Sequence, residues 1–252
     1  MKRAFFPLLL LLCLLAPSHA EAMRKWEYVN PQEIEIRITP EKAEITAGEV
    51  ATFTISIRNR TDKAVNIPFA TGQRWDLAVW HYETQIYRWS QGKYWSETPH
   101  SIPVRPGVNE TYKLAWRSID RNSCALPQGD YRIVGMVMTQ PRFLCSNTTR
   151  VRLLPPKLVP GKLVKVRLAQ AFELDLPTFF DREAINWKIE FDYNDNRVML
   201  IGQRQTSNTV TYVFNAERPG HVMMRLYAFP LFKDVTCSLE RRSYRVEVVS
   251  GD

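Results

Sequence analysis

Residues 52–58 of this chain read Thr52-Phe53-Thr54-Ile55-Ser56-Ile57-Arg58. Apolar and polar side chains alternate along this stretch, which is the period of a strand with one buried face and one face in water. The same period of two recurs at Ile34–Ile38 and Val65–Phe69. A sheet with one apolar face must cover that face with a second layer, so the pattern predicts a β-sandwich.

Further alternating stretches extend the predicted sheets, and turn-forming residues bound each of them. They are Trp75–Tyr82, Gln85–Trp89, Thr111–Arg117, Tyr131–Met138, Val164–Leu168, Phe172–Leu176, Trp187–Phe191, Val198–Gly202, Val210–Phe214, Val222–Ala228 and Tyr244–Val248. No helix longer than about two turns is predicted, and Asp181–Ile185 fits either one helical turn or a loop. We therefore expect an all-β protein with two immunoglobulin-like β-sandwich domains.

A proline-rich segment divides the predicted strands into two sets. Leu154–Gly161 holds three prolines in eight residues, and proline cannot donate to a strand ladder. We expect this segment to run extended over the surface as a linker over residues 155–162. The predicted domains are then residues 27–154 and 163–250.

The first 22 residues have the layout of a secretory signal peptide. Lys2 and Arg3 precede an apolar run from Phe5 to Ala16, and Pro17–Ala22 follows, with small residues at Ser18, Ala20 and Ala22. We expect cleavage of residues 1–22 and a periplasmic or secreted protein. No later apolar stretch is long enough to span a bilayer, so no transmembrane anchor is expected in the mature chain.

Charge and cysteine content exclude several kinds of site. The formal charge is +8, but the 34 Lys and Arg residues are dispersed, which does not predict nucleic-acid binding. Three isolated cysteines follow the signal, Cys124, Cys145 and Cys237, and their spacing does not predict a metal site. Either Cys124–Cys145 or Cys145–Cys237 can pair in an oxidising compartment, with one thiol left over. No cofactor is expected.

No catalytic pattern is present either. The chain contains no nucleophile elbow, no HExxH or CxxC motif and no phosphate-binding glycine loop. We therefore expect a protein that is not an enzyme.

One stretch in the first half has the composition of a binding loop. Thr71, Gly72, Gln73, Arg74 and Trp75 form it: Gly72 permits an unusual backbone angle, and Arg and Trp are residue types that anchor interfaces. The alternative, which we weigh as the stronger, is structural: Gly72 turns a corner, Gln73 satisfies backbone groups and Trp75 belongs to the core.

Other aromatic residues add two candidate binding features. Trp89 and Ser90 lie at a predicted strand end. Trp89 belongs to a group of closely spaced aromatic residues with Trp75, Trp80, Tyr94 and Trp95, and we expect at least half of these rings to be buried. Phe229, Pro230, Leu231 and Phe232 form a predicted hairpin tip. This tip suits a hydrophobic groove on a partner, but we slightly favour packing against the first domain.

An ordered series of motifs in the first half resembles the intracellular proteinase inhibitor (BsuPI) domain family. The series is Asn59–Asp62, Val65–Phe69, Thr71–Val79, Tyr87–Lys93, Pro106-Gly107, Tyr112 with Trp116, and Gly129–Tyr131. The resemblance extends from about residue 35 to about residue 140. It implies an immunoglobulin-like fold and inhibition of a serine protease.

The second half, over residues of about 163 to 250, resembles the chagasin-like inhibitors of papain-type cysteine proteases more weakly. Leu176-Pro177 leads to Trp187, and Phe214–Gly220 leads to Tyr227, while the loops at 178–186 and 228–232 differ from those of the family. Together with the signal-like first 22 residues, the resemblances imply an exported protein-binding module that inhibits an extracytoplasmic protease by loop insertion. The alternative is a cell-envelope adhesion or assembly module that binds sugars or a partner protein through exposed aromatic rings.

Overall fold

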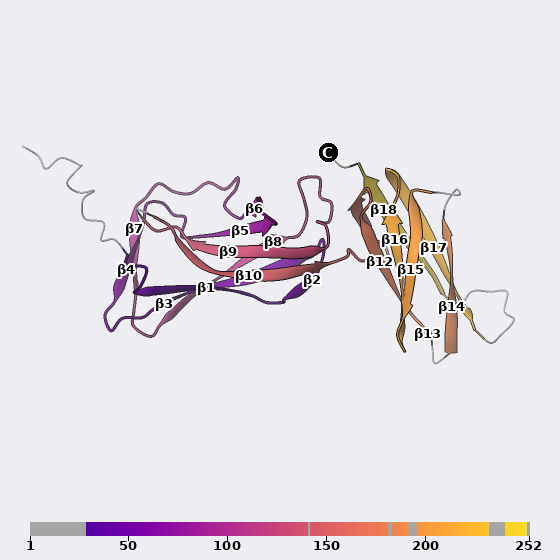
Figure 1. Cartoon of the computed structure of the whole chain (residues 1–252), viewed down its shortest axis with the longest axis horizontal. Coiled ribbons are helices and arrows are strands. Elements are labelled where there is room, and N and C mark those ends of the chain that lie inside the picture. The colour runs from indigo at the N-terminus through magenta and orange to yellow at the C-terminus, as the bar shows by residue number, and fades with distance from the viewer. Residues whose placement is uncertain (1–28, 141, 181–182, 192–195, 232–239, 251–252) are drawn as a thin grey trace, which may run out of the picture.

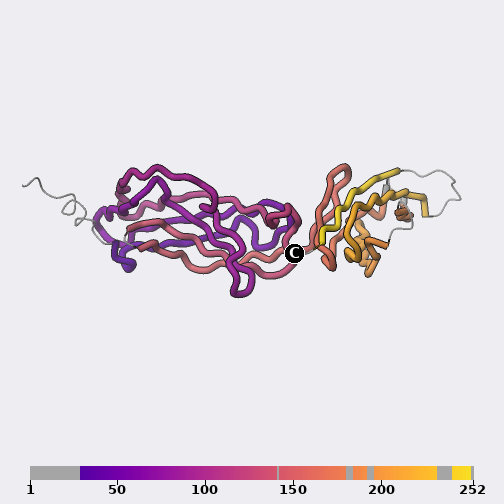
Figure 2. Tube along the Cα trace, turned by 90° about the horizontal axis from the view of Figure 1, so that it is seen from above, coloured from indigo at the N-terminus to yellow at the C-terminus, as the bar shows by residue number. Residues whose placement is uncertain are grey.

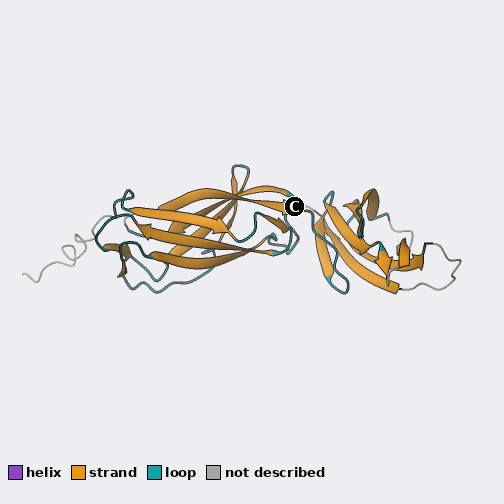
Figure 3. Ribbon diagram, turned by 90° about the horizontal axis from the view of Figure 1, so that it is seen from below, coloured by secondary structure: helices purple, strands orange, loops and turns teal. Residues whose placement is uncertain are grey.

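A computed structural model describes residues 29–140, 142–180, 183–191, 196–231 and 240–250. Strands and loops make up all of this described part, and no helix occurs in it (Figure 3). The predicted all-β fold with sandwiched sheets is therefore confirmed. The predicted signal peptide, Asp181, Arg182, Phe232 and Cys237 lie outside the described residues.

The first sandwich contains ten strands. They are β1 (Ile34–Pro40), β2 (Glu44–Thr46), β3 (Val50–Asn59), β4 (Val65–Phe69), β5 (Trp75–His81), β6 (Thr84–Arg88), β7 (His100–Val104), β8 (Asn109–Arg117), β9 (Gly129–Val137) and β10 (Leu144–Leu154). A three-stranded sheet, β1-β3-β8, packs against a five-stranded sheet, β2-β10-β9-β5-β6. The separate β4-β7 ribbon lies at the end of this sandwich that points away from the second one (Figure 1).

The alternating residues of 52–58 lie on the faces that their period of two predicted. Phe53, Ile55 and Ile57 of β3 are almost completely buried between the two sheets. Gly135 of β9 faces them from the opposite sheet, and a Cβ added to it would lie 2.9 Å from the Cδ1 atom of Ile55. The absence of a side chain at this position lets the sheets approach.

The second sandwich contains eight strands. They are β11 (Leu163–Arg167), β12 (Ala171–Pro177), β13 (Phe179–Phe180), β14 (Glu183–Phe191), β15 (Val198–Gln205), β16 (Thr209–Ala216), β17 (Gly220–Pro230) and β18 (Glu240–Val249). Their order is β11-β18-β17-β14-β13 in one sheet and β12-β16-β15 in the other. Phe172 and Phe214 stack in its core, with ring centroids 5.4 Å apart. Each half of the chain thus has a separate apolar core.

Polar contacts join the two sandwiches. Both Nε and Nη2 of Arg167 lie 2.7 Å from Asp120 Oδ2, and Gln170 Nε2 donates to the carbonyl of Leu126 at 3.1 Å. The backbone N–H of Ala125 donates to the carbonyl of Lys165 at 3.2 Å. The sandwiches lie one after the other along the long axis, with this joint between them (Figure 2).

The structure corrects three expectations about the backbone. Leu144–Leu154 is a strand that the sequence did not predict, because its first half is polar and a register shift between Cys145 and Thr148 interrupts the period. Strands β2, β7 and β13 were missed as well: β2 and β13 have only three and two residues, and β7 contains Pro103, which argues against a strand. Residues 183–185, assigned to a helical turn or a loop, begin β14 instead.

The proline-rich segment is bound to the second sandwich and does not simply run over the surface. Leu158 is buried in the second core, and its N–H donates to the carbonyl of Glu173 at 2.8 Å. Pro156 accepts from the Glu173 N–H at 2.9 Å. Proline lacks the donor but keeps the carbonyl, so one side of this segment still pairs.

The cysteine pairing is also corrected. Cys124 is buried and Cys145 exposed, and both are free thiols, so a Cys124–Cys145 disulfide is not formed. Burial raises the pKa of the buried Cys124 thiol, because loss of water disfavours the thiolate.

The close approach at Gly135 generates a stability prediction. Gly135→Ala places a methyl group against the buried Ile55, so we expect the free energy of unfolding to fall by about 1–3 kcal/mol through overpacking. Urea denaturation of the wild type and the variant measures this change in the free energy of unfolding.

Gly202→Ala is the matched control, because a Cβ there meets nothing nearer than Val213 Cβ at 4.0 Å. We expect this strand substitution to leave stability unchanged or slightly higher. Equal effects of the two substitutions would contradict the tight sheet contact at Gly135.

Candidate functional site

Two loops meet on the first sandwich beside the start of β5; one of them runs along the sandwich from β6 to β7 at its far end (Figure 1). We call residues 70–74, between β4 and β5, and residues 89–99, between β6 and β7, the distal loops (Figure 1). The N–H of Gly72 donates to the carbonyl of Ser96 at 2.8 Å, which joins them. The structure thus brings together the predicted residues Thr71–Trp75 with Trp89 and Ser90.

A buried carboxylate holds the start of the second distal loop. Asp76 is completely buried, and its Oδ1 accepts from the N–H groups of Leu77 at 2.8 Å and Ser90 at 3.0 Å. Its Oδ2 accepts from Ser90 Oγ at 2.7 Å and from Arg88 Nε at 2.6 Å. Every acceptor direction of this carboxylate therefore points to β5, to the end of β6 or to the loop that follows.

Sequence reasoning included Asp76 at the end of the candidate binding stretch but gave it no role. The available signal was a carboxylate inside a stretch whose neighbours, Trp75 and Leu77–Val79, are apolar. Acidic residues are almost never fully buried unless they are paired, so such a residue predicts a local network.

The rings of the second distal loop pack against one another, with one exception. Lys93 Nζ lies 3.0 Å from the centroid of the Trp89 ring. The ring of Trp95 also packs against Trp89, with ring centroids 5.7 Å apart. Partial burial lowers the pKa of Lys93, and the negative charge of Asp76 opposes that shift. Tyr94 is 99% exposed, so it is the ring that the loop offers to solvent.

Arg74 and Trp75 point inward. Trp75 is buried, and its ring centroid lies 3.9 Å from that of Tyr112 on β8. Arg74 donates from Nε to His100 Nε2 at 3.1 Å and from Nη1 to Tyr112 Oη at 3.3 Å. These two residues fix loop 70–74 on the sandwich; for Trp75, burial in the core is the structural alternative considered from the sequence.

Gly72 and Gln73 also have structural roles. The backbone of Gly72 is not in the left-handed region, so the expected unusual angle is wrong. Its small size matters instead, because a Cβ would lie 2.7 Å from Ser96 Oγ. Gln73 Nε2 donates to the carbonyl of Trp75 at 3.4 Å, which satisfies a backbone group.

A hollow opens beside Arg74, where the β4-β7 ribbon separates from the main sheets. It encloses about 130 Å³. Its apolar walls come from Ile57, Ile67, Phe69, Ile102 and Val104. Trp75, Tyr112, Arg74 and Glu110 complete it. Sequence reasoning named Tyr112 only within a family motif and did not select Glu110.

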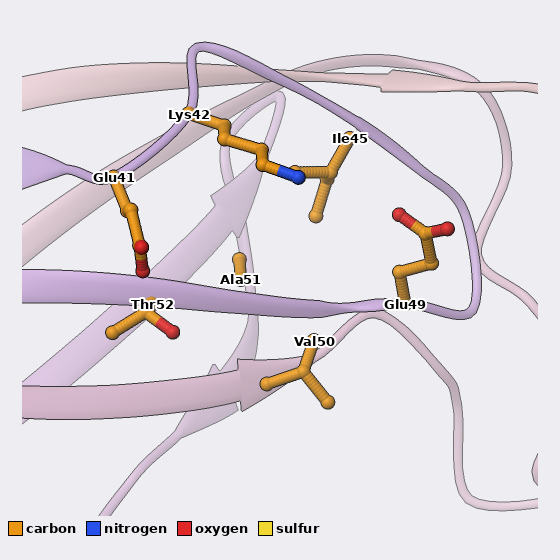
Figure 4. A pocket seen from close by; sticks show the side chains of 7 residues that line it. All are labelled: Glu41, Lys42, Ile45, Glu49, Val50, Ala51 and Thr52. Atoms are coloured by element: carbon orange, nitrogen blue, oxygen red, sulfur yellow. The ribbon is translucent and has the colours of Figure 1, made fainter.

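A second hollow contains none of the predicted site residues. Glu41, Lys42 and Glu49 line it together with short stretches of β2 and β3 (Figure 4). The Lys42 side chain extends across Ile45, so charged groups surround much of the opening. It is far from the distal loops, since the neighbouring residue Ala47 bonds to Leu154, beside the second sandwich.

The expected hairpin tip in the second half lies at the wrong end to contact the first sandwich. Phe229 and Pro230 end β17, whose other end, at Gly220, pairs with Val248 next to the joint. Leu231 follows and is 53% exposed. The slightly favoured packing against the first domain is therefore wrong, because the whole length of β17 separates the tip from it (Figure 1).

Two kinds of feature are absent from the described part of the chain. No group of three or more His, Cys, Asp and Glu side chains gathers there to hold a metal ion. Likewise, none of its segments forms a helix of the length and apolarity that crossing a membrane requires.

Comparison with solved structures finds weak similarities. A cysteine protease inhibitor from Entamoeba histolytica matches at 12% identity and a TM-score of 0.31, over 36% of this chain and 88% of its own. The CARDB domain of a Pyrococcus furiosus protein, in complex with di-metal ions, matches at 13% identity and a TM-score of 0.29, over 48% and 91%. A β-glucosidase from Erythrobacter marinus matches at 15% and 0.29, over 48% of this chain and 15% of its own.

Comparison by sequence gives a clearer result. No curated protein matches the chain. A family model does match, that of the intracellular proteinase inhibitor BsuPI, over residues 38–142. The resemblance predicted from the motifs is confirmed there: the part of the chain that carries both distal loops matches the intracellular proteinase inhibitor family.

Proposed function

We propose that this protein inhibits a protease by inserting its distal loops into the protease cleft. The observation that carries the proposal is the exposed ring of Tyr94 on a loop whose first residues a buried carboxylate holds. The match of residues 38–142 to a family of proteinase inhibitors supports it. The protein would act by occupying the cleft and would perform no chemistry itself.

The geometry suits such a role because the loop is ordered before it binds. A loop that is already fixed loses little conformational entropy when it enters a cleft, so more of its contact energy appears as affinity. Ser90 is held by Asp76, and Ser96 by Gly72. Tyr94 lies between these two points, and tyrosine is among the residue types that dominate binding energy at interfaces.

The partner would contact the first sandwich. Phe229 and Leu231 lie at the far end of the second sandwich, so one cleft would not take them together with Tyr94. The proposal therefore rests on the distal loops. Because the first 22 residues have the layout of a secretory signal, we also propose that the target protease lies outside the cytoplasm.

Inhibition is tested by titration against a panel of serine and papain-type proteases. We expect at least one to lose activity at stoichiometric micromolar protein. For that protease, Tyr94→Ala should raise the inhibition constant about thirtyfold, the effect of losing about 2 kcal/mol at a central contact.

Tyr82→Ala is the control for that series, because Tyr82 is also 83% exposed but lies in the β5–β6 turn. It should leave the inhibition constant unchanged. A panel without any inhibited protease, or an inhibited protease that does not distinguish Tyr94→Ala from the wild type, would count against the proposal.

The order of the loop depends on Asp76. Asp76→Asn keeps the size of the side chain but turns one acceptor into a donor that faces N–H or O–H groups of Arg88 or Ser90. We expect a loss of about 1–3 kcal/mol in unfolding free energy and faster hydrogen exchange at the Ser90 amide. Asp130→Asn, at an exposed position of β9, should change neither. An unchanged exchange rate at Ser90 in Asp76→Asn would show that the carboxylate does not order the loop.

A further inference from the structure

The hollow beside Arg74 holds two opposite charges that do not pair with each other. Glu110 occupies an inward-facing position of β8, between the outward-facing Asn109 and Thr111. Among the residues that the structure describes, its carboxylate has no hydrogen-bond or ion-pair partner. The guanidinium of Arg74, in the same hollow, bonds only to His100 and Tyr112 within that part of the chain, and neither partner is a carboxylate.

These two charges are separated along the hollow. Glu110 and Tyr112 lie two residues apart on one face of β8, which places them about 7 Å apart along the strand. Arg74 is bonded to the hydroxyl of Tyr112. A small ligand with one anionic and one cationic group can therefore lie between Arg74 and Glu110.

The remaining walls suit an apolar body. The isoleucines, Phe69 and Val104 present only hydrocarbon, and the rings of Trp75 and Tyr112 add two aromatic surfaces. The enclosed volume of about 130 Å³ is close to that of cavities, about 150 Å³, that hold a benzene molecule. One benzene ring or one branched aliphatic side chain would fill it.

We propose that this hollow binds an apolar α-amino acid in its zwitterionic form. Arg74 uses its remaining N–H groups to bind the carboxylate, Glu110 accepts from the ammonium group, and the side chain fills the apolar walls. Each ionic contact pairs a charged group of the ligand with a side chain of opposite charge that has no ionic partner in the described part of the protein. This site does not depend on protease inhibition, because its ligand contacts neither Tyr94 nor the exposed part of loop 89–99.

The test is isothermal titration of the full chain with L-phenylalanine and L-leucine. Two analogues separate the contributions: 3-phenylpropanoate lacks the ammonium group, and 2-phenylethylamine lacks the carboxylate. We expect saturable binding of both amino acids and at least about tenfold weaker binding of each analogue, since a hydrogen bond to a charged group contributes about 1.5–3 kcal/mol.

Two variants assign the charges. Glu110→Gln should weaken L-phenylalanine binding at least about tenfold and leave 3-phenylpropanoate binding unchanged. Arg74→Gln should weaken the binding of L-phenylalanine and leave the binding of 2-phenylethylamine unchanged. If Arg74→Gln does not fold, Arg74→Lys, which keeps the charge, is titrated in its place. Lys113→Gln, an exposed position on β8, is the control and should bind L-phenylalanine as the wild type does.

Three results would overturn the inference. The first is the absence of binding heat, and of chemical-shift changes at Tyr112, with millimolar L-phenylalanine. The second is 3-phenylpropanoate or 2-phenylethylamine binding as tightly as L-phenylalanine. The third is an equal loss of L-phenylalanine and 3-phenylpropanoate binding in Glu110→Gln.

Discussion

The buried carboxylate of Asp76 is the interaction on which the distal loops depend. It accepts four hydrogen bonds, from the backbone and side chain of Ser90, the backbone of Leu77 and the guanidinium of Arg88. A charge removed from water is tolerated only when such donors surround it, so the network forms as a whole or not at all. This requirement fixes where β6 ends and how loop 89–99 begins.

The joint between the sandwiches is polar, in contrast to both cores. The side-chain hydrogen bonds there join Arg167 to Asp120 and Gln170 to the carbonyl of Leu126. The proline-rich segment adds backbone pairing to Glu173. Hydrogen bonds of fixed direction define an orientation without requiring a large apolar face on either half, so each sandwich keeps its own core.

The period of two along Phe53, Ile55 and Ile57 was sufficient to predict the fold, because burial of one face is a local property of the sequence. Strand β10 escaped the same reasoning, since polar side chains and a register shift occupy its first half. Site residues were harder to predict. Whether Arg74 points outward or toward Tyr112 depends on β8, a strand far away in the sequence, and no local pattern encodes that contact.

Arg74 links the hollow to the distal loops through its neighbours. It bonds to His100 at the start of β7 and to Tyr112 of β8, and it follows Gly72, which bonds to Ser96 in the other loop. A ligand that holds the Arg74 guanidinium therefore restricts loop 70–74 and, through Gly72, the segment that carries Tyr94. Because coupling between two binding events is reciprocal, a partner that contacted loop 70–74 would change the affinity of the hollow for its ligand by the same factor. The sheet edge at β8 would in this way connect the two sites without any movement of the cores.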